Sequence, residues 1–105
     1  MELLQGNTYK INVEIKVDDS DIDINDIEKI QFTFGRKVEK IYDGENDDVT
    51  YAGNNIFVVK LTQEDTFKFD GTVDYQIRVK FKDGEVKGIE PEQWDILESI
   101  TKEVL

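Results

Sequence analysis

A ten-residue alternation of apolar and polar side chains, Val73–Lys82, constrains the fold of this chain more than any other segment. The odd-numbered positions from Val73 to Phe81 are apolar, and the positions between them are polar. This period of two is typical of a β-strand with one buried face, because successive side chains of a strand point to opposite faces. Such a strand needs a second layer to cover its apolar face, so the segment predicts a layered β-sheet protein.

Shorter segments with strand-like patterns recur along the chain. We predict strands over Thr8–Val17, Ile27–Phe34, Val38–Tyr42, Val49–Tyr51 and Ile56–Leu61. Turn-forming residues separate these segments about every ten residues, as in sandwiches and barrels. With 105 residues in total, we expect one all-β domain, residues 1–105, built as an antiparallel sandwich or barrel.

Two local signals refine this expectation. Thr62 precedes three polar or acidic residues, which predicts a single helical turn over Thr62–Thr66 with Thr62 as its cap. Asp83-Gly84 is the dipeptide of two-residue hairpin turns, so Glu85–Ile89 should return as the next strand.

The C-terminus has two interpretations. Trp94, Leu97, Ile100 and Val104 have helical spacing, and Pro91 is acceptable near a helix start. Alternate apolar residues also permit a strand. We favour a strand over Trp94–Glu98 followed by a short tail.

Composition argues against several classes of function. The chain has no Cys and no His, so thiol chemistry, disulfides and the commonest neutral-pH base and metal ligand are excluded. The only serines, Ser20 and Ser99, therefore have no His to activate them. We predict no enzyme activity and no cofactor.

Charge and hydropathy limit the partners further. The 24 acids and 13 bases give a net charge of −11, opposite to the positive surface that nucleic-acid binding needs. The first ten residues lack a basic segment before an apolar run, and no stretch has the length of a membrane helix. We expect a soluble, cytoplasmic protein that binds neither nucleic acid nor membranes.

Acidic residues concentrate in residues 18–48, a segment that contains eleven acids and four bases. This segment does not form an EF-hand, because its loop has Ile24 and Ile30 where the motif needs Gly and Glu. Converging loops could still collect Ca²⁺ weakly, and the candidate ligands are Asp18, Asp19, Asp21, Asp47 and Asp48. The alternative interpretations are a solvated loop and an acidic patch that docks on a basic protein surface.

Two resemblances involve Leu61–Thr66, LTQEDT. This run resembles the E–F corner of immunoglobulin variable domains, although Asp70-Gly71 then turns the chain and the bridging cysteines are missing. More broadly, FTFG at 32–35, VTY at 49–51, residues 60–84 and ESITKEVL at 98–105 resemble small prophage-encoded proteins of low-GC Gram-positive bacteria. Those proteins lie among tail and baseplate genes, and the resemblance implies an immunoglobulin-like β-sandwich of about seven short strands.

The resemblance also implies a function. We expect a phage or prophage structural protein, associated with a tail or baseplate, that binds other phage structural proteins or itself. It would be made in the cytoplasm of the bacterial host and incorporated in the virion. The candidate contact residues are Tyr42, Gln76, Arg78 and Trp94, although Trp94 also suits a core position. The alternatives are a carbohydrate- or receptor-binding module and an acidic inhibitor that mimics nucleic acid.

Overall fold

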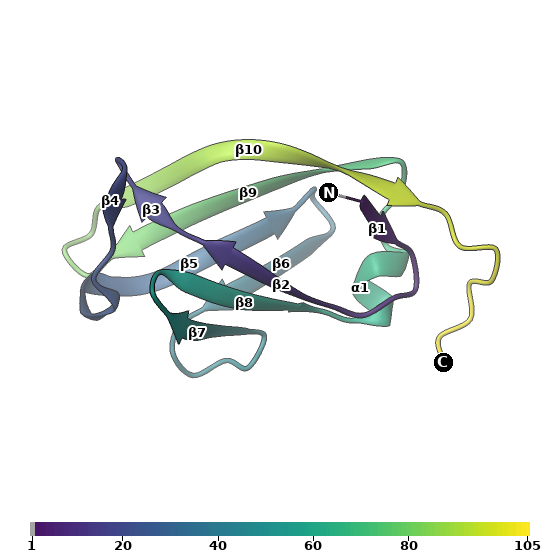
Figure 1. The fold of residues 1–105 in the computed structure, drawn as a ribbon, viewed down its shortest axis with the longest axis horizontal. Helices are drawn as coiled ribbons and strands as arrows, with labels where there is room; N and C mark the ends of the chain where they lie inside the picture. Colours follow the sequence, from purple (N-terminus) through teal and green to yellow (C-terminus); the bar gives the residue numbers. More distant parts are fainter. Residues whose placement is uncertain (1) are drawn as a thin grey trace.

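The alternating segment forms β9 (Thr72–Phe81), inside a five-stranded sheet (Figure 1). The computed structural model describes residues 2–105, apart from the side chain of Glu90. The other described elements are β1 (Glu2–Leu4), β2 (Tyr9–Glu14), β3 (Lys16–Val17), β4 (Ser20–Asp21), the 3-10 turn η1 (Ile24–Asp26), β5 (Ile27–Phe34), β6 (Val38–Tyr42), β7 (Val49–Gly53), β8 (Ile56–Leu61), α1 (Gln63–Phe67) and β10 (Val86–Leu97).

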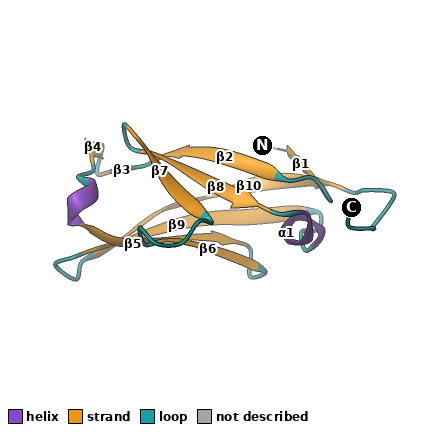
Figure 2. Ribbon diagram, turned by 90° about the horizontal axis from the view of Figure 1, so that it is seen from below, coloured by secondary structure: helices purple, strands orange, loops and turns teal. Residues whose placement is uncertain are grey.

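The strands form two main sheets, which Figure 2 shows as layers. The larger sheet has the order β1-β10-β9-β5-β6, and the smaller sheet has the order β2-β8-β7. All pairs are antiparallel except β1 with β10, which is parallel. The predicted all-β fold is confirmed, and the narrower immunoglobulin-like assignment stays a prediction.

The core lies between the inner faces of the two sheets. Phe32 of the larger sheet approaches Phe57 of the smaller sheet, with ring centroids 6.5 Å apart. The alternating residues of β9 from Val73 to Val79 are buried on this side, as their period predicted. Burying each large apolar side chain contributes roughly 1.5–3 kcal/mol, so the sheets stabilise one another through this shared core.

The predicted helical turn is confirmed and is held by its own sequence. The Thr62 hydroxyl accepts from the Asp65 N–H at 3.1 Å, and an Asp65 carboxylate oxygen accepts from the Thr62 N–H at 2.8 Å. This reciprocal capping box satisfies two of the free donors at the helix start.

Thr66 ties α1 to the N-terminal segment. Its hydroxyl accepts from the Gly6 N–H and donates to the Asn7 carbonyl, both at 2.9 Å. Gly6 has a φ of +85°, and a Cβ there would lie 2.7 Å from the Phe67 ring. A larger residue at position 6 would therefore meet both an unfavourable backbone conformation and a packed ring.

A buried ion pair joins α1 to the edge strand β6. Lys40 Nζ lies 2.8 Å from the Asp65 carboxylate, and the two side chains are only 9% and 12% exposed. Burial raises the pKa of Asp65, but the hydrogen bonds from Lys40 and the Thr62 N–H outweigh it, so the net pKa is lowered. The LTQEDT run is therefore a structural corner in this chain.

The predicted strand Thr8–Val17 is wrong as one element. It divides at Ile15, whose N–H donates to the Asn55 carbonyl at 2.8 Å and whose side chain is fully buried. The chain then leaves sheet pairing with β8, and β3 forms a small hairpin with β4. Asp18 and Asp19 make its turn with φ values of 52° and 61°, a conformation that Asp tolerates.

The turn after β9 is longer by one residue than predicted. The Phe81 N–H donates to the Glu85 carbonyl and the Gly84 N–H donates to the Phe81 carbonyl, which closes a three-residue loop. In this region only Gly84 has a positive φ, as a three-residue hairpin loop with a bulge requires.

The C-terminal strand interpretation is confirmed, and the helical alternative is wrong. The two predicted strands Glu85–Ile89 and Trp94–Glu98 are parts of one strand, β10, interrupted by a register shift between Ile89 and Glu92. Pro91 lies within this irregularity, where a missing N–H is tolerated. Among the described residues, no helix has the length and hydropathy to cross a membrane.

Candidate protein interface

Two predicted contact residues lie together on the outer face of the larger sheet. Gln76 and Arg78 are exposed on β9, opposite Thr33 and Gln31 of β5. On the other side Arg78 pairs with Gly88 of β10, which has no side chain to cover it. The strand alternation thus presents both residues to solvent, and they remain candidate contact residues.

This outer face carries bases although the chain as a whole is acidic. Arg78 and Lys80 border a shallow hollow of about 140 Å³, with Lys29 and the half-exposed Val86 at its rim. Lys80 pairs with Glu28 at 3.0 Å. Because both side chains of that pair are largely exposed, it adds little stability.

The other two predicted contact residues differ in exposure. Tyr42 is half-buried and packs edge-on against Phe57 at 5.1 Å. Trp94 is only 4% exposed and stacks on Tyr75 with centroids 4.6 Å apart. Trp94 therefore belongs to the core in this structure, and its role as a contact residue stays a prediction.

The calcium candidates come from two separate segments. Asp18, Asp19 and Asp21 belong to the β3–β4 hairpin, and Asp47 and Asp48 precede β7. Within the described part of the chain, no three Asp, Glu, His or Cys side chains are placed to hold a metal ion. The structure therefore gives no support to the convergence that this hypothesis requires.

An open groove lies between β2, an edge strand of the smaller sheet, and the strands β9 and β10 of the larger sheet. Its apolar lining includes Ile11, Val13, Ile77 and Ile89, and its volume is about 320 Å³. Asn12, Glu14 and Glu92 supply polar groups. We call this feature, with Tyr75 and Trp94 at its base, the open-edge groove.

Tyr75 places a polar atom in the apolar part of this groove. Its side chain is only 5% exposed, and its hydroxyl finds no hydrogen-bond partner among the described residues. Burial raises the pKa of this hydroxyl, and the nearby Glu92 carboxylate raises it further. An unpaired buried hydroxyl costs free energy in the isolated chain, so it marks a place where an incoming donor or acceptor would be favoured.

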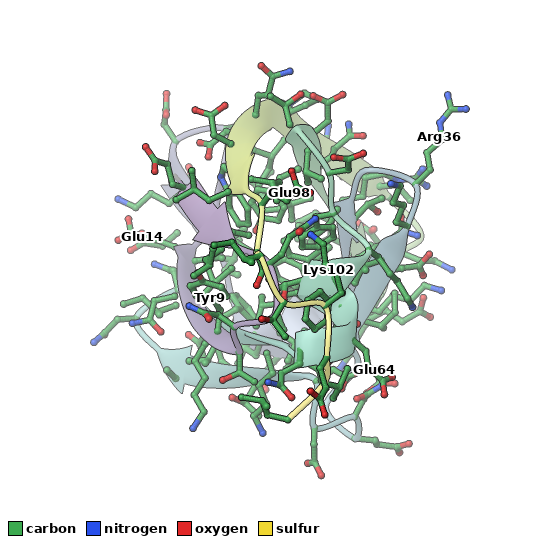
Figure 3. All side chains as sticks on the ribbon, turned by 90° about the vertical axis from the view of Figure 1, so that its right-hand side faces the viewer. Tyr9, Glu14, Arg36, Glu64, Glu98 and Lys102 are labelled. Atoms are coloured by element: carbon green, nitrogen blue, oxygen red, sulfur yellow. The ribbon has the colours of Figure 1, made fainter. Side chains whose placement is uncertain are left out.

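A second feature lies at the end of the molecule where the chain terminates. The exposed large apolar side chains in the described residues are Leu4, Val86, Leu97, Ile100, Val104 and Leu105. All but Val86 belong to β1, the end of β10 or the tail that follows it. Figure 3 views this end, with the tail passing from Glu98 past Lys102 and across α1.

Sequence reasoning missed Lys40, the open-edge groove and the tail as features of interest. A signal for Lys40 was present, since it alternates with Val38 and Tyr42 and so falls on the inward face of its strand. The groove had no local signal, because it depends on which strand edges remain unpaired.

Comparisons with known proteins found no similar protein. No protein-family model matches this chain, and no curated protein or solved structure shows significant similarity to it.

Proposed function

We propose that this chain is a structural component of a phage or prophage particle, associated with its tail or baseplate, and that it acts by protein–protein contact without catalysis. The resemblance of residues 32–35, 49–51, 60–84 and 98–105 to small prophage-encoded proteins supports the assignment. The chain would be made in the cytoplasm of the bacterial host and incorporated in the virion.

The observation that carries the proposal is the apolar end of the molecule. Ile100 and Leu105 are 103% and 96% exposed, and Leu97, the last residue of β10, is half exposed. Large apolar side chains that stay in water are costly, and several of them at one end of a native protein mark a candidate interaction site. Among the described strands, the outer edge of β2 and the part of β10 before Asp95 have no partner on one side, and free edges bind strands of other chains.

The test is quantitative mass spectrometry of purified particles. The prophage of the strain that carries the gene is induced, and the copy number of this chain per particle is measured. We expect several copies. Abundant protein in the lysate with none in the particles would contradict the proposal and would favour an acidic inhibitor or an assembly factor.

A further inference from the structure

We propose that the open-edge groove of one copy receives the C-terminal tail, residues 98–105, of a second copy of this chain. This inference rests on the proposed function and names the partner that one contact surface binds. Four observations carry it: the free strand edges, the exposed tail, the fit of the tail to the groove, and the position of β1, which opposes binding of the tail in its own copy.

The groove offers two strand edges with unused backbone groups. β2 pairs with β8 on one side, and none of the described strands pairs with its other edge. β10 pairs with β9 along most of its length, but β1 covers only Asp95–Leu97 of its outer edge. No described strand pairs with the outer edge of β10 from Val86 to Trp94. Lys16–Asp19 of the β3–β4 hairpin line a hollow with Lys87–Ile89, so the part of the edge open to an added strand runs from Ile89 to Trp94.

The tail is held by polar contacts that leave its apolar side chains outside. The Ser99 N–H and Lys102 Nζ both donate to the Gln5 side-chain oxygen, and the Leu105 N–H donates to that of Gln63. Ile100, between the first two contacts, is fully exposed. This arrangement leaves Ile100 exposed to solvent, outside the core of its own copy.

Tail and groove fit in length and chemistry. Eight extended residues span about 26 Å, enough to pass along the groove beside β10 from Ile89 to Trp94. Ile100 suits the apolar lining of Ile11, Val13 and Ile89. Lys102 follows two residues later, so on an extended strand it points to the same side and can pair with Glu14 or Glu92. A strand there also brings backbone groups toward the unpaired Tyr75 hydroxyl.

The position of β1 opposes a fold-back of the chain's own tail along β10. The tail follows Leu97, and β1 already occupies the outer edge of β10 at Asp95–Leu97 (Figure 1). A contact between two different surfaces of identical copies repeats head to tail and closes into a ring or extends as a filament. The structure therefore favours a second copy as the donor of the strand.

The absence of cysteine in the natural sequence permits a direct test. An Ile100→Cys chain and a size-tagged Val13→Cys chain are mixed under mild oxidation. A disulfide forms only when the two Cα atoms approach to within about 7 Å, so the expected product is the mixed dimer. Thr50→Cys, an exposed β-branched position on β7 at the other edge of the smaller sheet, replaces Val13→Cys as the matched control. Equal yields with both partners would overturn the inference.

A second measurement uses the unmodified chain. Sedimentation velocity over a concentration series should show association of the wild type, and Ile100→Asp should weaken it about 10–100-fold, the loss of one buried isoleucine. Because Ile100 is fully exposed, this substitution should leave the fold of the single copy intact. A wild-type chain that stays monomeric throughout overturns this inference, whereas its presence in particles would still uphold the proposed function.

Discussion

The substitution Tyr75→Phe removes a single oxygen atom, the unpaired hydroxyl in the open-edge groove. In the isolated chain this hydroxyl is shielded from water and has no described partner, while its ring stacks on Trp94 and Phe34. An unsatisfied buried polar group costs about 1–3 kcal/mol, and the ring contacts survive in phenylalanine. We therefore expect Tyr75→Phe to stabilise the protein by about 1–2 kcal/mol.

The measurement is urea unfolding at neutral pH, followed by tryptophan fluorescence and by circular dichroism. An unchanged slope with a higher midpoint would show that stability alone has changed. Tyr9→Phe is the matched control, because the Tyr9 hydroxyl accepts from the Leu4 N–H at 2.8 Å. Tyr9→Phe makes the same chemical change but removes a hydrogen bond, so its free energy of unfolding should be about 0.5–1.5 kcal/mol lower than that of the wild type.

Alkaline pH provides an independent test of the same hydroxyl. Burial raises the pKa of Tyr75 in the folded state, whereas the pKa of a tyrosine in the unfolded chain is about 10. The folded state therefore keeps the proton that the unfolded state loses, so stability falls as the pH rises above about 10. This part of the decline should be absent in Tyr75→Phe. A variant that is less stable than the wild type at neutral pH would refute the reasoning.

Three further predictions concern the corner around α1, each checked by urea unfolding. Asp65→Asn should lower the free energy of unfolding by about 3–5 kcal/mol, because it leaves Lys40 buried without its counter-charge. The pKa of Asp65 is lowered in the folded state, so the stability that its charge contributes above about pH 4 is lost as the pH falls through that pKa. Asp65→Asn should lack this pH dependence. Thr66→Val should cost about 1–3 kcal/mol through the loss of its hydrogen bonds to Gly6 and Asn7. Gly6→Ala should cost about 1–3 kcal/mol by overpacking the Phe67 ring. Losses below about 0.5 kcal/mol in these variants would contradict the described contacts.

Local periodicity was enough to predict most of the sheet. The strands β5, β6 and β8 have the predicted bounds, and β9 begins and ends one residue earlier than predicted. In each of these strands one apolar face is buried in the core, and the burial of that face explains the alternation seen in the sequence. The cap at Thr62 was equally local, since its partner Asp65 lies three residues away.

Features that depend on distant partners were not predictable in this way. β1 has only three residues and exists because its edge meets the end of β10, more than ninety positions later. The division at Ile15 depends on the Asn55 carbonyl, and the ion pair of Asp65 depends on Lys40. The open-edge groove likewise arises from which edges stay unpaired, a property of the whole topology.

We propose that this chain is built into a particle through its contact surfaces. The most direct test of this proposal is the copy number per particle in a strain that lacks the gene and is complemented with the wild type or with Ile100→Asp. We expect several copies of the wild-type chain per particle and a clear loss of the variant at equal expression. Particles that contain neither chain would contradict it.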